Sequence, residues 1–234
     1  MNKELDIETY LYISSDKFGI YVFDTHELNN LYKYELNIQN NDNNIDLFIL
    51  NDFLNSNIFK IEKLINKFVK NIFLIIENKN ILKLDIGIKK KNYNSILSKN
   101  DLINSLTEVK DLFKESYQDE KIMHIIVNKY IIDDNVFKTF ENISQCDQLS
   151  LEIQFISISE NLISNLDKVL ETFQIKIIRY LEGNYIRNYF NDDNLEISKI
   201  AHQIIRGINV NEVVLVPKNI KKKGFFEKFF QLFS

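Results

Sequence analysis

The chain has 234 residues, 45% of them hydrophobic and 26% charged, so it can bury a substantial core in one domain or two small ones. One proline and five glycines exclude a proline-rich linker and an array of glycine-rich nucleotide loops. A single cysteine, Cys146, excludes an internal disulfide, and we expect a protein of a reducing compartment.

Charge is distributed unevenly along the chain. The net charge is −4, but residues 218–234 contain five lysines and one glutamate, which leaves about −8 for the remainder. We expect no nucleic-acid partner, because affinity for phosphates comes from lysines and arginines across a surface. The first ten residues are acidic and the apolar run 72–76 is short, so we expect no secretory signal and no spanning helix.

The predicted elements alternate between strands and helices. Alternating apolar residues predict three N-terminal strands, and apolar spacings of three and four predict a helix over 54–68. Ser98 and Asp101 form a capping-box pattern before a second helix, 102–113. The remaining pattern predicts strands at 72–77, 81–90, 120–130, 148–159 and 175–181 and helices at 159–173 and 185–190. The fold class is therefore mixed α/β.

Two segments are interpreted as peripheral. The lysines Lys89–Lys91 are predicted to form a solvated loop, with contact to lipid as the alternative. Asn191–Asn194 is typical of a linker, and the weak helical pattern that follows, up to Val216, is interpreted as an attachment rather than as core.

No cluster of residues predicts catalysis or metal binding. His26, His124 and His202 lie far apart without a ligand spacing, and His124 is expected to pack or hydrogen-bond within a strand. Cys146 has no neighbouring base and is expected to be a semi-buried thiol. Asp133-Asp134 and Asp192-Asp193 suit turns better than a metal site. We therefore expect no enzymatic activity and no metal.

The C-terminal segment has the pattern of a membrane-binding helix. On a helix, its phenylalanines and one leucine share a face, and lysines precede that face. Such a helix places its rings at the acyl boundary and its lysines near anionic lipid. The alternative is docking of the same face onto the protein's own core or a protein partner. The predicted membrane-binding residues are Lys221, Lys222, Lys223, Phe225, Phe226, Lys228, Phe229, Phe230, Leu232 and Phe233.

Several segments in order resemble the bacterial cell-division protein FtsA, an actin-like membrane adaptor. The most specific match is Met123–Asp134, followed by the strand 149–159, Phe173–Lys176 and the lysine- and phenylalanine-rich ending. The resemblance covers 9–190 and the tail. It implies a first actin-like subdomain at 1–79 and 155–190, an inserted subdomain at 80–154, a remnant or linker at 191–217, and a basic linker with an amphipathic helix at 218–234.

The chain departs from FtsA where that family binds nucleotide. Tyr12–Lys17 matches the family's first phosphate loop, and Lys17 is retained as a remnant. The family's aspartate, which organises metal, is replaced by Tyr12, and its glycine, which admits phosphate close to the backbone, by Ser14. The second actin-like half is also missing. We therefore expect no cofactor, ATP included.

The resemblance implies a non-enzymatic adaptor at the cytoplasmic side of the inner membrane, at the division site or septum. Its expected partners are the inner leaflet, proteins of the divisome, and a second copy through the inserted subdomain. FtsZ is a candidate, although the subdomain that usually grips its tail is missing. Two alternatives remain open: an adaptor of pilus assembly resembling PilM, and a weak ATP-binding protein that a partner chain completes.

Overall fold

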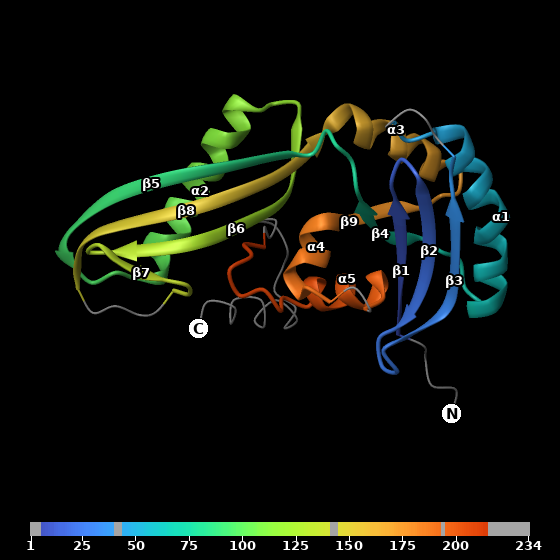
Figure 1. The fold of residues 1–234 in the computed structure, drawn as a ribbon, viewed down its shortest axis with the longest axis horizontal. Helices are drawn as coiled ribbons and strands as arrows, with labels where there is room; N and C mark the ends of the chain where they lie inside the picture. The colour runs from blue at the N-terminus through green and yellow to red at the C-terminus, as the bar shows by residue number, and fades with distance from the viewer. Residues whose placement is uncertain (1–5, 40–43, 141–144, 193–194, 215–234) are drawn as a thin grey trace. The chain divides into compact units, whose positions relative to one another are not determined.

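The computed structural model describes residues 6–39, 44–140, 145–192 and 195–214 (Figure 1). Contacts divide the chain into two compact units, which are described separately. Unit 1 comprises Met1–Ile81 and Ile158–Arg206, and unit 2 comprises Leu82–Ser157 and Gly207–Ser234. The described part contains two sheets and five helices, which confirms the mixed α/β fold class.

Unit 1 is built on a five-stranded sheet in the order β3-β2-β1-β4-β9. β1 pairs antiparallel with β2, and β2 with β3, whereas β1, β4 and β9 run parallel. Parallel neighbours require long crossovers, and the chain between β1 and β4 passes through β2, β3 and a helix. The strands are β1 Ile7–Ile13, β2 Lys17–Asp24, β3 Asn29–Asn37, β4 Asn71–Ile76 and β9 Lys176–Glu182.

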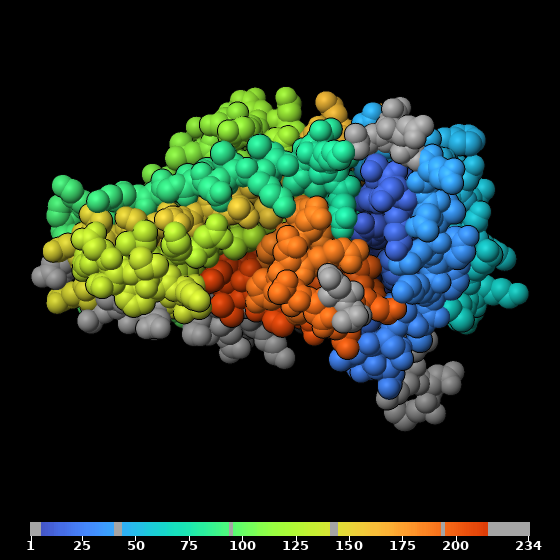
Figure 2. Space-filling model, viewed as in Figure 1, coloured from blue at the N-terminus to red at the C-terminus, as the bar shows by residue number. Residues whose placement is uncertain are grey.

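Helices cover both faces of this sheet. α1 (Leu47–Ile65) packs against β2 and β3, and α3 (Glu160–Glu171) packs against β9 and α1. On this face the ring of Phe18 meets that of Phe53, at 5.9 Å between centroids. α4 (Gly183–Phe190) and α5 (Ile197–Ile205) cover the other face, where their side chains, in orange, pack beside the blue N-terminal strands in Figure 2. Tyr10 and Tyr12 point into that second layer. β1 and β2 are consequently buried almost throughout.

The interpretation of 195–216 as an attachment is wrong for α5. Ile197, Ile200 and Ile204 recur at helical spacing and are buried in the core of unit 1. His202 also joins α5 to β1, since its Nδ1 lies 2.6 Å from Oε2 of Glu8. The isoleucine spacing is present in the sequence. The linker-like segment Asn191–Asn194 before it nevertheless favoured the interpretation as an attachment.

Unit 2 is a four-stranded sheet, in the order β5-β8-β6-β7, with α2 on one face. Its elements are β5 Leu82–Ser95, α2 Lys99–Ser116, β6 Glu120–Ile132, β7 Asn135–Phe137 and β8 Cys146–Ser159. The capping box is confirmed, because Ser98 and Asp101 each accept the other's backbone N–H. The lysine loop was a wrong prediction, since Lys89–Lys91 lies within β5 and pairs in register with β8.

The segment Asn209–Val214 lies along β6 and adds backbone contacts to its edge. The N–H groups of Val127 and Val213 donate to the carbonyls of Asn211 and Ile125, at 2.9 and 2.8 Å. Behind them, His124 Nδ1 lies 2.7 Å from Oε1 of Glu212, with both side chains buried. The expectation that His124 hydrogen-bonds within a strand is confirmed.

The other residues singled out in the sequence have structural contacts. Asp133 and Asp134 form the turn between β6 and β7 with positive φ angles of 46° and 66°, as expected. Cys146 is buried and contacts Asn92, whose side-chain amide donates to its sulfur. Burial raises the pKa of the Cys146 thiol. Within the described ranges, no three His, Cys, Asp or Glu side chains converge as ligands would.

Candidate functional site at the carboxyl edge of the parallel strands

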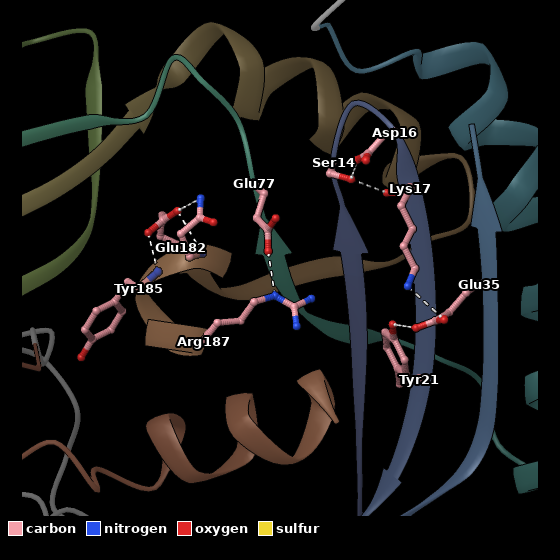
Figure 3. Close-up of polar contacts among 10 residues, drawn as sticks. Ser14, Asp16, Lys17, Tyr21, Glu35, Glu77, Glu182, Tyr185 and Arg187 are labelled. Atoms are coloured by element: carbon pink, nitrogen blue, oxygen red, sulfur yellow. Dashed lines mark hydrogen bonds and ion pairs between the residues drawn. The ribbon is translucent and has the colours of Figure 1, made fainter. Parts of the chain in front are cut away.

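The carboxyl ends of β1, β4 and β9 meet at one edge of the unit 1 sheet, where open α/β sheets commonly bind ligands. Ser14 follows β1, Glu77 follows β4, and Glu182 ends β9. The N–H of Glu77 donates to the carbonyl of Ile13 at 2.9 Å, which holds the first two strand ends together. Figure 3 shows the side chains that gather at this edge.

Glu182 caps the helix that begins at the edge. Its carboxylate accepts from the backbone N–H of Asn184 and of Tyr185, at 3.1 and 2.7 Å, and from the side-chain amide of Asn184. The two backbone N–H groups belong to the first turn of α4, where such groups have no acceptor within the helix. The positive end of this helix is therefore neutralised by the protein's own buried carboxylate.

Glu77 is paired with Arg187 from α4. The Nε of Arg187 donates to Oε1 of Glu77 at 3.1 Å, and the guanidinium lies 5.7 Å from the centroid of the Tyr12 ring. Burial disfavours the charge on Arg187, but the hydrogen bond and charge of Glu77 outweigh it and raise the pKa of the guanidinium. Burial and the charge of Glu77 raise the pKa of the Tyr12 phenol to about 12.

Gly183 allows Glu77 to approach α4 closely. A Cβ at position 183 would lie 2.3 Å from Cγ of Glu77, well inside van der Waals contact. The glycine is therefore required by close packing, because the Glu77 side chain occupies the space of a Cβ.

The turn between β1 and β2 is closed by its own side chains. The N–H of Ser14 donates to the carbonyl of Lys17 at 2.9 Å, and its hydroxyl donates to Asp16 and to the same carbonyl. Lys17 points along the sheet to β3, where its Nζ lies 3.0 Å from Oε2 of Glu35 (Figure 3).

A tyrosine completes the Lys17–Glu35 pair. The hydroxyl of Tyr21 donates to Glu35, and burial together with this bond raises the pKa of the phenol. Burial alone would raise the pKa of Glu35, but the bonds from Tyr21 and Lys17 hold it below its usual value. The predicted phosphate-loop remnant, Lys17, is therefore engaged in an intramolecular ion pair with Glu35.

Sequence reasoning located the Tyr12–Lys17 turn but missed Glu77, Glu182 and Arg187. A signal was present for the two acids, because Glu77 ends one predicted apolar strand, Glu182 directly follows another, and parallel strands end at one edge. No spacing rule connects Arg187 to Glu77, since their pairing depends on how α4 packs. The predicted membrane-binding residues, Lys221 to Phe233, lie outside the described residues. Among the described helices, none is long and apolar enough to cross a membrane.

Comparisons with known proteins support the fold. No family model matches the sequence, and no curated protein matches it. Solved structures do match. The chain is similar to one in the PilM-PilN type IV pilus biogenesis complex, with a TM-score of 0.51 and 7% identity over 78% of this chain and 49% of that one. This chain thus spans about half the length of that structure.

Two further solved structures are similar over comparable lengths. One is the cytoplasmic domain of EpsL, an inner-membrane component of the type II secretion system of Vibrio cholerae, at a TM-score of 0.41, 5% identity, and 77% and 59% coverage of the two chains. The other is a protein from Bacteroides thetaiotaomicron described as having an actin-like ATPase fold. Its TM-score is 0.34 and its identity 14%, over 80% of this chain and 56% of that one. The chain has a mixed α/β fold similar to that of a chain in the PilM-PilN complex, and the comparisons do not favour FtsA in particular.

Proposed function

We propose that this chain is a non-enzymatic, PilM-like adaptor that works at the cytoplasmic face of the inner membrane. In this proposal it binds a partner protein of a pilus-type assembly and no nucleotide. The support from comparison is the likeness of its fold to a chain of the PilM-PilN complex.

The observation that carries the non-enzymatic part is the internal pairing of the edge donors. Lys17 is paired with Glu35, the α4 N-terminus with Glu182, and Arg187 with Glu77. Phosphate groups bind where backbone N–H groups and cations are free to meet them. Here a nucleotide would have to displace three intramolecular contacts and lie beside the three carboxylates that make them. We infer a structural role for this edge, which fixes α4 on the sheet.

The membrane part of the proposal comes from the sequence of the tail. Its phenylalanine-rich face and preceding lysines, from Lys221 to Phe233, have the chemistry of an interfacial anchor. Each lysine close to an anionic surface contributes on the order of 1 kcal/mol. An acidic body with such a tail would be held at the membrane with most of its surface available to a protein partner.

Co-sedimentation with phosphatidylglycerol vesicles tests this function. We expect the full chain to pellet with these vesicles and much less with phosphatidylcholine vesicles. A chain ending at Asn219, and the double variant Phe226→Glu/Phe229→Glu, should remain in the supernatant. Phe48→Glu is the matched control, because Phe48 is a highly exposed phenylalanine of α1, outside the tail. Equal pelleting of all four proteins, or of none, would contradict the anchor.

A second candidate is the FtsA-like adaptor of cell division, for which unit 2 would be the inserted subdomain. The feature that favours it is the lysine-rich spacer with the phenylalanine-rich ending, which resembles the FtsA tail more than an expected PilM ending. Retention of the chain by FtsZ filaments in a co-pelleting assay would favour the division adaptor over the PilM-like adaptor.

A further inference from the structure

Unit 1 has a groove at the edge of its sheet opposite to the candidate site. The groove has a volume of about 660 Å³, and it is formed by the end of α1, the loop that leads into β4 and the loop that leads into β9. Asn71 and Lys176, which begin β4 and β9, both line it. Because β4 and β9 run parallel, these amino ends lie away from Glu77 and Glu182.

Two phenylalanines border this groove with their rings in solvent. Phe59 is 73% exposed and Phe68 is 78% exposed, whereas their neighbours Ile58 and Val69 are buried. Single exposed apolar residues are common on protein surfaces, but here two exposed rings line one groove. Exposed aromatic groups of this kind are enriched among the residues that anchor protein partners.

Hydrogen bonds from backbone N–H groups fix the walls of the groove. The carboxylate of Glu62 accepts from the N–H of Val69 at 3.1 Å, and the N–H of Lys176 donates to the carbonyl of Lys70 at 2.9 Å. Asn66 and Gln174 turn the two loops with left-handed φ angles of 53° and 59°. The groove is therefore a preformed part of the fold, and little ordering of its backbone would be needed for binding.

The charge of the groove is opposite to that of the body. Lys70 and Lys176 are exposed at its lining, and within the described residues neither has an ion-pair partner. The one acid of the lining, Glu62, is bonded to Val69. The chain before residue 218 has a net charge of about −8, whereas the lining of the groove has two lysines and one acid.

We propose that this groove binds an acidic segment of a partner protein, with apolar side chains against Phe59 and Phe68 and carboxylates at Lys70 and Lys176. The proposal rests on the adaptor function above and gives the chemistry of its protein partner. The same charges disfavour the chain's own lysine-rich tail as the occupant, because Lys70 and Lys176 repel it. The partner surface and the membrane-binding tail are then separate parts of the chain.

Two synthetic peptides test the groove on the full chain. One labelled peptide has phenylalanines at helical spacing separated by glutamates, and the second has the same phenylalanines with lysine in place of every glutamate. Fluorescence anisotropy should show saturable binding of the acidic peptide and none of the basic one. Failure of the acidic peptide to bind, or equal binding of both peptides, would overturn the proposal.

Substitutions at exposed positions then locate the binding. Phe59→Ser/Phe68→Ser should weaken the affinity for the acidic peptide by about tenfold or more. Lys70→Glu/Lys176→Glu should abolish its binding and allow the basic peptide to bind. Phe48→Ser is the control, since Phe48 is 76% exposed on the same helix but does not line the groove. Unchanged affinity in both double variants would place the peptide elsewhere and refute the groove.

Vesicle binding separates this proposal from the proposed function. The groove variants should still pellet with phosphatidylglycerol vesicles, because they leave the tail intact. Groove variants that lose peptide binding but still pellet with the vesicles would support the groove as the binding site for the peptide. Normal peptide binding by a chain that no longer pellets would refute the anchor alone. Self-association that Phe59→Ser/Phe68→Ser abolishes would identify a second copy as the occupant and overturn the acidic partner.

Discussion

His124 and Glu212 are 88 positions apart in the sequence, and their buried side chains lie 2.7 Å apart within unit 2. This contact attaches Asn209–Val214 to β6, next to the two backbone hydrogen bonds of the same segment. The segment lies N-terminal to the proposed membrane-binding tail in the sequence. The described fold therefore fixes Asn209–Val214 to unit 2 through a polar pair with little access to water.

Loss of this pair should destabilise unit 2. We expect His124→Ala to lower the free energy of unfolding by roughly 2–4 kcal/mol, because it removes the side chain that the buried Glu212 carboxylate contacts at 2.7 Å. Urea denaturation followed by circular dichroism measures the change. The residues 207–214 should also become accessible to protease.

His26→Ala is the matched control for this experiment, because His26 is exposed in a turn and should change stability by less than about 0.5 kcal/mol. Equal stability of His124→Ala and His26→Ala would mean that the buried pair contributes nothing to attachment.

Gly183 should be intolerant of a single methyl group. Gly183→Ala places a Cβ 2.3 Å from Cγ of Glu77, which is itself held by Arg187, and we expect a loss of about 1–3 kcal/mol. In a Glu77→Ala background the space is free, so the same substitution should cost much less. Thermal or urea unfolding of the four proteins of this double-mutant cycle measures the coupling.

Gly87→Ala provides the comparison, because nothing lies within 4 Å of a Cβ built there. We expect its stability to remain within about 0.5 kcal/mol of the parent chain. If Gly183→Ala were equally harmless, the close approach of Glu77 to α4 would not be rigid.

Alkaline pH should destabilise the protein through tyrosines that are buried or half-buried. Burial raises the pKa of Tyr12, Tyr130 and Tyr180 to about 12, from about 10 in the unfolded chain. Between these values the unfolded chain binds fewer protons than the folded one, so stability falls as the pH rises. Below about pH 10 the phenols are protonated in both states, and their contribution is fully present.

The test is a set of urea midpoints from about pH 9 to the alkaline unfolding limit, with phenolate absorbance to follow ionisation. Tyr12→Phe should reduce the fall between about pH 10 and pH 12, because one titrating group is removed. A slope identical to that of the parent chain would show that Tyr12 ionises alike in both states.

Local patterns predicted the elements well, and long-range partners could not be predicted. The Ser98–Asp101 box needed only two residues three positions apart, and the structure contains both of its hydrogen bonds. α5 carried a readable pattern, but its burial depends on a sheet face formed by distant strands. His124–Glu212 and Glu77–Arg187 pair across 88 and 110 positions, which no local spacing specifies. The groove at Phe59 and Phe68 likewise requires the loop at Phe173, far along the chain.

ATP with magnesium should not stabilise the chain. A ligand that binds only the folded state raises the melting temperature, by an amount set by its concentration relative to its Kd. The cations and helix donors at the sheet edge are already paired with Glu35, Glu77 and Glu182, so we expect no shift in differential scanning fluorimetry, even at millimolar nucleotide.

Glu35→Gln is the informative variant, because it frees Lys17 from its ion pair without changing side-chain size. It should lower stability slightly and still give no nucleotide shift, since Tyr12 and Ser14 remain where an actin-like phosphate loop has aspartate and glycine. A concentration-dependent rise in the parent chain that Lys17→Ala abolishes would instead establish the nucleotide-binding alternative.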